Sequence, residues 1–285
     1  MDWSERRRRF RAILAGDACI HPASVFDPIS ARVAEDLGFA AGMFAGSVAS
    51  LTVLGAPDIV VLTLSEFAAQ AYRIGRAGSL PLLVDADHGY GNALNVKRTV
   101  EELESAGVAA LTIEDTALPR PFGSEAAQLI PIAEGVGKLR AALAGRQDPA
   151  LAIVGRTSAV AVTGLDDAIA RARAYAAVGV DALFFAGITT PAQLDAVAAA
   201  VDLPIILGGA APALADRAML AARKVRVCLQ GHQPFAAAVR AVHDALKALR
   251  DGAAPATIPV ASAELMARVT RDGDYKRWSK EFLGG

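Results

Sequence analysis

The sequence is poor in cysteine, with only two such residues among 285. Cys19 and Cys228 lie far apart and belong to no CxxC pair, so we expect neither a disulfide framework nor a structural zinc site. This use of cysteine predicts a reducing, cytoplasmic setting. The apolar runs are too short and interrupted to span a membrane, and no long apolar core follows the N-terminal charges, as a secretory signal requires.

A surplus of charge of one sign is also missing, because the formal net charge is −1. The chain therefore offers no polyanion-binding surface on average, and we expect no nucleic-acid or membrane partner. A block of arginines at positions 6–9 and 11 departs from this balance. We interpret it as the solvated face of an amphipathic helix that buries Trp3, Phe10 and Leu14. A nucleic-acid arm or a targeting peptide is the alternative.

Two familiar active-site motifs are absent as well. Residues 46–49 have the sequence GSVA, which lacks the GxSxG frame of a hydrolase nucleophile. Residues 89–93 have the sequence GYGNA, which does not complete the GxGxxG pattern of a dinucleotide-binding turn. A serine hydrolase and a dinucleotide-binding fold are therefore disfavoured.

Short apolar runs and helical stretches alternate along most of the chain, 53% of which is hydrophobic. We predict strands at 19–25, 41–45, 81–84, 108–113, 151–154, 182–185, 204–207 and 225–229. The predicted helices span 30–37, 65–74, 96–105, 134–144, 166–178, 191–200, 212–222 and 234–250. Regular alternation of this kind indicates a parallel sheet with helices outside, and eight units predict an α/β fold, a (β/α)8 TIM barrel.

Two segments interrupt this alternation. Residues 115–130 are long for a connection between a strand and a helix, and loops of this kind at the carboxyl-terminal face of a barrel are often lids. The tail after residue 252 has helical spacing at 263–269 and 275–282. We therefore predict a barrel domain at 1–252, including the N-terminal helix, and a helical extension at 253–285 that packs on its own barrel or on a partner subunit.

Acidic residues gather where two neighbouring predicted strands end. Asp85 and Asp87 follow one strand, and Glu114 and Asp115 follow the next. A single aspartate at a strand end often only caps the following helix. Carboxylates converging from adjacent strands are better explained by a hard divalent cation such as Mg²⁺, which prefers oxygen ligands. We therefore predict a magnesium site here and exclude the neighbouring His88 as a ligand.

Other strand ends supply residues suited to a small anionic substrate. Arg156 follows the fifth strand, where it either grips a substrate carboxylate or pairs with the acids in a structural ion network. His232 follows the eighth strand, and core packing and substrate contact are both open for it. No lysine falls at the carboxyl-terminal end of a predicted strand, so the Schiff-base chemistry of an aldolase is disfavoured.

These strand-end motifs resemble the isocitrate lyase / phosphoenolpyruvate mutase superfamily over residues 23–243. The resemblance rests on SVFDP at 24–28, GSVAS at 46–50, DADHGYGN at 85–92, LTIED at 111–115 and GH at 231–232. Residues 87–96 and 134–138 are most similar to the oxaloacetate decarboxylase branch. The superfamily's lyases carry a KKCGH loop with a catalytic cysteine, whereas residues 116–130 contain no cysteine, which argues against isocitrate or methylisocitrate cleavage.

The resemblance also implies roles for individual residues. Asp85 matches the direct Mg²⁺ ligand, with Mn²⁺ as a substitute, and Asp87 and Glu114 match carboxylates that hold the waters of the ion. The residues that match substrate-binding positions are Ser47, Arg156 and His232, the last two also being catalytic.

The implied reaction is decarboxylation of a small 2-oxo dicarboxylate, oxaloacetate, to pyruvate and CO₂. The alternatives are another C–C or P–C lyase of the superfamily, of the methylisocitrate or phosphonopyruvate type, and a non-catalytic barrel that binds a diacid. The resemblance further implies a homo-oligomer, a dimer of dimers (homotetramer) in which the last barrel helix is exchanged between subunits.

Overall fold

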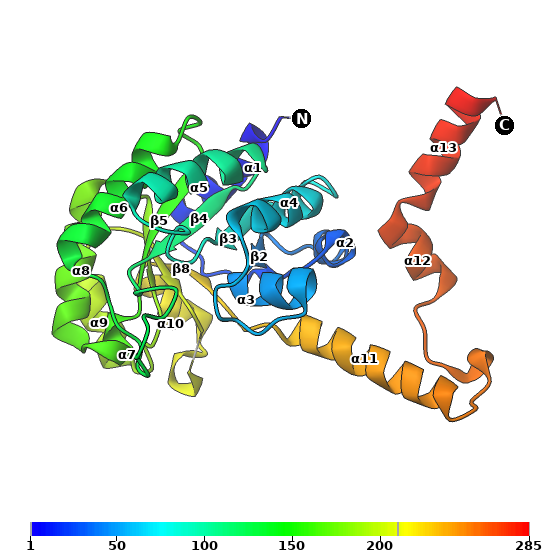
Figure 1. Ribbon diagram of the computed structural model, residues 1–285. Helices are drawn as coiled ribbons and strands as arrows, with labels where there is room; N and C mark the ends of the chain where they lie inside the picture. Colours follow the sequence, from blue (N-terminus) through cyan, green and yellow to red (C-terminus); the bar gives the residue numbers. More distant parts are fainter. Residues whose placement is uncertain (1, 210, 285) are drawn as a thin grey trace. The chain divides into compact units, whose positions relative to one another are not determined.

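The computed structural model describes residues 2–209 and 211–284 and contains a parallel sheet of eight strands in sequence order (Figure 1). The strands are β1 (Ala23–Ser24), β2 (Gly42–Phe44), β3 (Leu82–Asp85), β4 (Ala110–Glu114), β5 (Ala152–Thr157), β6 (Ala182–Phe185), β7 (Ile205–Leu207) and β8 (Val225–Cys228). Each strand lies within or close to a predicted one. The predicted barrel fold is therefore confirmed, in the form of a curled, half-open barrel.

The first and last edges of the sheet meet at a short seam. Ile20 donates its N–H to the carbonyl of Arg226 and accepts from the N–H of Cys228, both over 2.9 Å, which makes a parallel bridge between Ile20 and Val227. His21 adds a hydrogen bond of 2.8 Å between its Nδ1 and the Cys228 carbonyl. The segment before β1 thus joins β8 and draws the curled sheet together.

Helices follow the strands and lie outside the sheet (Figure 1). They are α2 (Pro28–Asp36), α4 (Leu64–Gly75), α5 (Ala93–Ser105), α6 (Ile132–Gly145), α8 (Leu165–Val178), α9 (Pro191–Ala200) and α10 (Arg217–Ala222). The helix predicted at 212–222 is divided, because Asp216 caps α10 by accepting the N–H of Ala218 over 2.8 Å after a 3₁₀ turn at Pro212–Leu214. The short helices α3 (Gly46–Ala49) and α7 (Ala159–Val162), and the π-helical turn η1 (Ser50–Leu54), were not predicted.

Two apolar cores hold the barrel together. One lies between the sheet and the surrounding helices. The other lies among inward-facing strand residues such as Met43, Leu83 and Phe184. The N-terminal helix α1 (Ser4–Ala15) contributes Phe10 and Leu14 to this second core, as the predicted apolar face requires.

The expectation that the arginines of α1 form a solvated face is wrong for two of them. Arg6 and Arg7 are only 7% and 4% exposed. Arg6 donates to the carbonyl of Gly75 over 2.7 Å, and Arg7 donates to those of Val108 and Glu104 over 3.0 and 2.5 Å. The last carbonyls of a helix lack partners within it and carry partial negative charge, so the arginines cap the ends of α4 and α5.

The chain divides into two compact units, Met1–Gly231 and His232–Gly285. The second unit holds α11 (Gln233–Arg250), the 3₁₀ turn η3 (Pro255–Thr257), α12 (Ala263–Thr270) and α13 (Asp272–Leu283). The helices predicted at 263–269 and 275–282 are confirmed. The domain boundary predicted after residue 252 stays a prediction, although the units separate before α11. No helix among residues 2–209 and 211–284 is long and apolar enough to cross a membrane.

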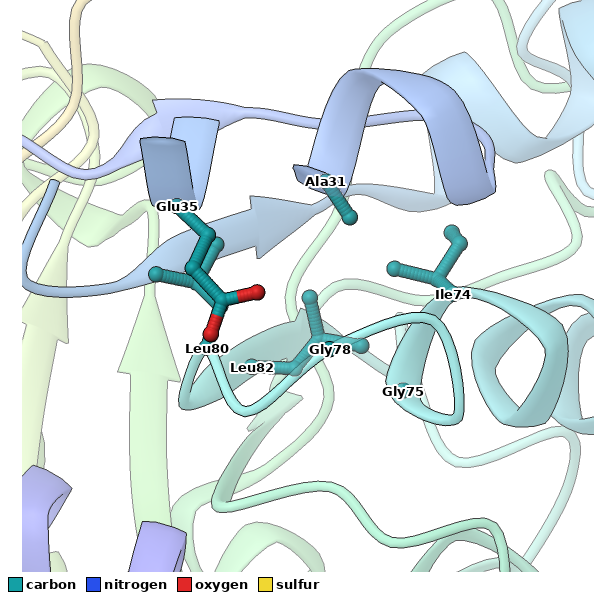
Figure 2. A pocket seen from close by; sticks show the side chains of 7 residues that line it. All are labelled: Ala31, Glu35, Ile74, Gly75, Gly78, Leu80 and Leu82. Atoms are coloured by element: carbon teal, nitrogen blue, oxygen red, sulfur yellow. The ribbon is translucent and has the colours of Figure 1, made fainter. Parts of the chain in front are cut away.

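A small cavity lies beside the start of β3 (Figure 2). Ala31 and Glu35 of α2 line it together with Gly78 and Leu82, and its volume is about 10 Å³. The Glu35 carboxylate accepts a hydrogen bond of 2.9 Å from the N–H of Ser79. A space of this size holds at most one water molecule, so the cavity is a packing feature and not a substrate site.

Candidate active site

Asp85 ends strand β3 at the edge of the sheet where barrel enzymes place their catalytic side chains. Its pairing partner on the adjacent strand β4 is Thr112, whose buried hydroxyl donates to Asp85 Oδ1 over 2.8 Å. The N–H of Asp87 donates to the same oxygen over 3.3 Å, and Arg156 pairs with Oδ2. Donors from three segments therefore fix the orientation of this carboxylate.

Arg156 lies opposite Glu114 in the pairing of β5 with β4. One guanidinium nitrogen is 3.1 Å from Glu114 Oε2, and another pairs with Asp85. The centre of the guanidinium lies 5.1 Å from the ring centroid of Phe184, a distance typical of a cation–π contact. The ion network that the sequence allowed for Arg156 is thus present, and its role in binding a substrate anion stays a prediction.

The acids at this edge carry more negative charge than Arg156 neutralises. Burial, together with the charge of Asp85, raises the pKa of Glu114 to about 7 against the opposing attraction of Arg156. Burial also raises the pKa of Asp87 well above its usual range, with repulsion from Asp85 and Glu114 adding to the rise. For Arg156, burial is the largest single influence and lowers the pKa, but the attraction of Asp85, Glu114 and Asp87 together with the hydrogen bond to Asp85 outweighs it, and the net shift is upward.

A divalent cation fits this donor set. Asp85, Asp87 and Glu114 offer only carboxylate oxygens, the ligand class that Mg²⁺ prefers, and their mutual repulsion is relieved by positive charge. In the described part of the chain, no three His, Cys, Asp or Glu side chains form a ready-made metal site. Arg156 instead links Asp85 to Glu114. The three metal assignments therefore stay predictions.

The end of β2 closely approaches the end of β3. A Cβ atom on Gly46 would lie 2.7 Å from Asp87 Oδ2, so a side chain at position 46 would displace this carboxylate. Ser47 is the next residue, half-buried in the first turn of α3. The structure thus places the segment that contains Ser47 against Asp87, and the substrate-binding role of Ser47 stays a prediction.

Asp58 is a further acid near Asp87 that strand-end patterns do not reveal. Its negative charge adds to the upward shift of the Asp87 pKa, after burial, Asp85 and Glu114. Asp58 lies in the connection between η1 and α4, well beyond the last residue of β2. The sequence offers one indication of Asp58, because this acid lies in the segment that follows the carboxyl-terminal end of β2.

Asp115 differs from the other three acids in its partners. Its Oδ2 accepts from the hydroxyl of Tyr175 over 2.8 Å and from Arg171 over 3.0 Å, both on α8. Arg171 also donates to the carbonyl of Ile130, whose N–H donates to the carbonyl of Asp115, each over 2.9 Å. Asp115 and Arg171 therefore tie together the two ends of the loop at 116–130. Of the four acids expected to converge, Asp115 is held by α8, while its charge still raises the pKa of Glu114.

The two histidines of the predicted motifs lie in different units. His88 is buried, and burial together with the nearby charge of Lys138 lowers its pKa to about 4. This favours a neutral imidazole at neutral pH. His232 is the first residue of the second unit and the N-cap residue of α11. Its contact with substrate stays a prediction.

Charged side chains gathered at the carboxyl-terminal strand ends of an eight-stranded α/β barrel define the class of barrel enzymes. Within this class, the chain belongs to the phosphoenolpyruvate phosphomutase family, whose sequence model matches residues 10–250.

Relatives of known name cover the whole chain. A Bradyrhizobium sp. (strain BTAi1 / ATCC BAA-1182) protein named oxaloacetate decarboxylase is 62% identical over 99% of this chain and 99% of its own. A Rhodopseudomonas palustris (strain BisA53) protein of the same name is 60% identical over 100% of this chain and 99% of its own.

Solved structures share the fold at lower identity. A phosphonopyruvate hydrolase in complex with oxalate and Mg²⁺ is 27% identical with a TM-score of 0.86, covering 98% of this chain and 99% of that one. A 2,3-dimethylmalate lyase of the PEP mutase/isocitrate lyase superfamily is 27% identical with a TM-score of 0.84, covering 98% of each chain. The superfamily expected from the strand-end motifs is therefore confirmed.

Proposed function

We propose that this chain is a carboxy-lyase that converts oxaloacetate to pyruvate and CO₂, using Mg²⁺, with Mn²⁺ as a substitute. The observation that carries this proposal is identity of about 60% over the full chain to proteins named oxaloacetate decarboxylase. The donor set at the strand ends supports the metal: Asp85 as direct ligand, and Asp87 and Glu114 as holders of its waters.

The side chains at the strand ends have distinct tasks in this reaction. Arg156 neutralises a substrate carboxylate, because its planar guanidinium matches carboxylate geometry. The hydroxyl of Ser47 donates to a substrate oxygen. The bond between the substrate's methylene carbon and the departing carboxylate breaks, and its electron pair passes into an enolate. His232 returns one proton to that carbon. Bound Mg²⁺ would supply a Lewis acid for the keto oxygen.

Assembly and location are further parts of the proposal. The exposed apolar residues on α11, among them Val242 and Leu246, support a homo-oligomer, and the superfamily resemblance makes it a dimer of dimers. The free, buried state of both cysteines, Cys19 and Cys228, supports a cytoplasmic location.

The test follows pyruvate formation from oxaloacetate by the purified protein with Mg²⁺, against a blank with metal alone. We expect turnover above this blank, and a loss of about 10²–10³-fold in kcat/KM for Asp85→Ala, since Lewis-acid stabilisation amounts to several kcal/mol. Asp202→Ala, at an exposed acid paired with Lys224, is the matched control and should keep full activity.

Three results would each contradict part of the proposal. Equal rates with and without protein reject the activity, whereas an unchanged Mg²⁺ response in Asp85→Ala removes that residue from its role. Phosphonopyruvate and methylisocitrate are assayed in parallel, and faster turnover of either one replaces oxaloacetate as the substrate.

A further inference from the structure

Lys138 is a buried cation to which the proposed reaction gives no task. It lies on α6, and only 4% of the residue is exposed. Burial lowers the pKa of Lys138, partly opposed by Glu134, Glu114 and Asp115. Its hydrogen bond of 2.9 Å goes to the backbone carbonyl of His88 and not to a carboxylate. Burying an ammonium group is unfavourable, so this contact calls for an explanation.

The carbonyl that Lys138 holds is one of three in succession, each bound by a donor from a different element. The Asp87 carbonyl accepts the N–H of Glu114 on β4 over 2.8 Å. The His88 carbonyl accepts from Lys138 on α6. The Gly89 carbonyl accepts the hydroxyl of Thr99 on α5 over 3.1 Å. The backbone directly after Asp87 is thus fixed from three directions, and Lys138 supplies the charged donor.

This backbone needs such support because of its conformation. Asp87 has φ of +46° and Gly89 has φ of +78°, so the His88 peptide lies between two left-handed residues. The left-handed region is unfavourable for a residue with a Cβ atom, such as Asp87, and persists only where neighbours enforce it.

We propose that Lys138 is a positioning residue for the metal-binding loop. By holding the His88 carbonyl, it keeps the peptide after Asp87 in the orientation that presents the Asp87 carboxylate to the waters of the ion. Lys138 contacts neither ion nor substrate. The proposal rests on the proposed function, because it assigns the ion to Asp85, Asp87 and Glu114.

The test measures metal binding to the substrate-free protein. Mn²⁺ is titrated and followed by electron paramagnetic resonance, with Mg²⁺ added in competition. Lys138→Met removes the donor but keeps an unbranched side chain of similar bulk. Alanine would instead leave a space that water could enter. We expect Mg²⁺ affinity to fall about tenfold or more, the usual effect of losing a residue that orients a ligand.

Arg7→Met is the matched control, because Arg7 is another buried cation that donates to backbone carbonyls, but at the opposite end of β4. It should lower the melting temperature while leaving Mg²⁺ affinity within about twofold of the unsubstituted value, since it acts far from the ligands. Lys138→Leu, which also removes the donor and keeps an apolar side chain, is the second variant and covers the case in which Lys138→Met does not fold.

The outcomes separate the two proposals. Weaker metal binding in a Lys138 variant with unchanged binding in Arg7→Met supports the positioning role. Equal binding by a folded Lys138 variant overturns that role alone, as does an equal loss in Arg7→Met. Failure of the unsubstituted protein to bind Mn²⁺ or Mg²⁺ overturns the metal assignment itself and with it the role of Lys138.

Discussion

Glu114 illustrates how burial and charge compete at a single residue. Its pKa is raised from an ordinary value of 4.5 to about 7, because burial outweighs the attraction of Arg156. Between these two values the folded state holds a proton that the unfolded state has released. The free energy of unfolding therefore falls as pH rises through this window, and stability is greater on its acidic side.

The direction of this pH dependence can be tested by urea unfolding of the metal-free protein at pH 5 and pH 7.5. Between these conditions we expect the unsubstituted protein to lose roughly 1–3 kcal/mol more stability than Glu114→Gln, which does not titrate. Glu101→Gln, at a surface acid paired with Lys97, should follow the unsubstituted protein. Identical pH profiles for the unsubstituted protein and Glu114→Gln would contradict the raised pKa.

At the scale of an element, α1 acts as a cap for the amino-terminal end of the barrel. Adjacent arginines on this helix have opposite surroundings, since Arg7 is buried and donates to a carbonyl of α5, whereas the side chain of Arg8 is 62% exposed and pairs with Glu5. Comparing substitutions at Arg7 and Arg8 therefore separates the effect of a buried structural contact from that of a surface charge on the same helix.

We expect Arg7→Met to lower the free energy of unfolding by about 3 kcal/mol, because it leaves Asp148 and two backbone carbonyls without their buried donor. Arg8→Met should change it by less than about 0.5 kcal/mol, since exposed ion pairs contribute little. Chemical unfolding at one pH measures both. Similar effects of the two substitutions would mean that α1 does not cap the helices in this way.

Elements were predictable where their own residues carry the signal. Strands β3 and β4 are short apolar runs, and the acids Asp85 and Glu114 end them, so both strands and both candidate metal ligands follow from the local pattern. Partners that come from distant segments leave no local mark. The burial of Arg7 depends on carbonyls at and beyond the end of α5, and the contact of Lys138 with His88 crosses from α6 to the loop after β3. Periodicity alone cannot reveal either contact.

At the scale of the whole molecule, α11 presents an apolar stripe with no buried residue. Val239, Val242, Leu246 and Leu249 recur at intervals of three and four, and each is between 42% and 62% exposed. Such spacing places them on one face of the helix, and an exposed apolar face of this kind is typical of a protein interface.

If this stripe joins subunits, the double substitution Val242→Glu with Leu246→Glu should reduce the assembled mass in sedimentation experiments towards that of one chain, because it buries charge in the interface. Ala241→Glu introduces a glutamate at an exposed position on another face of the helix and should leave the mass unchanged. An unaltered assembly in the double variant would place the subunit contact elsewhere.

The seam between Ile20 and Val227 has a consequence for biosynthesis. Every other neighbouring pair of strands is consecutive in the chain, whereas this bridge joins the start of the barrel to its last strand. During translation the growing sheet keeps an uncovered edge beside β1 until β8 has left the ribosome. Uncovered edges pair readily with other chains, so the final strand to emerge is the one that protects the first from aggregation.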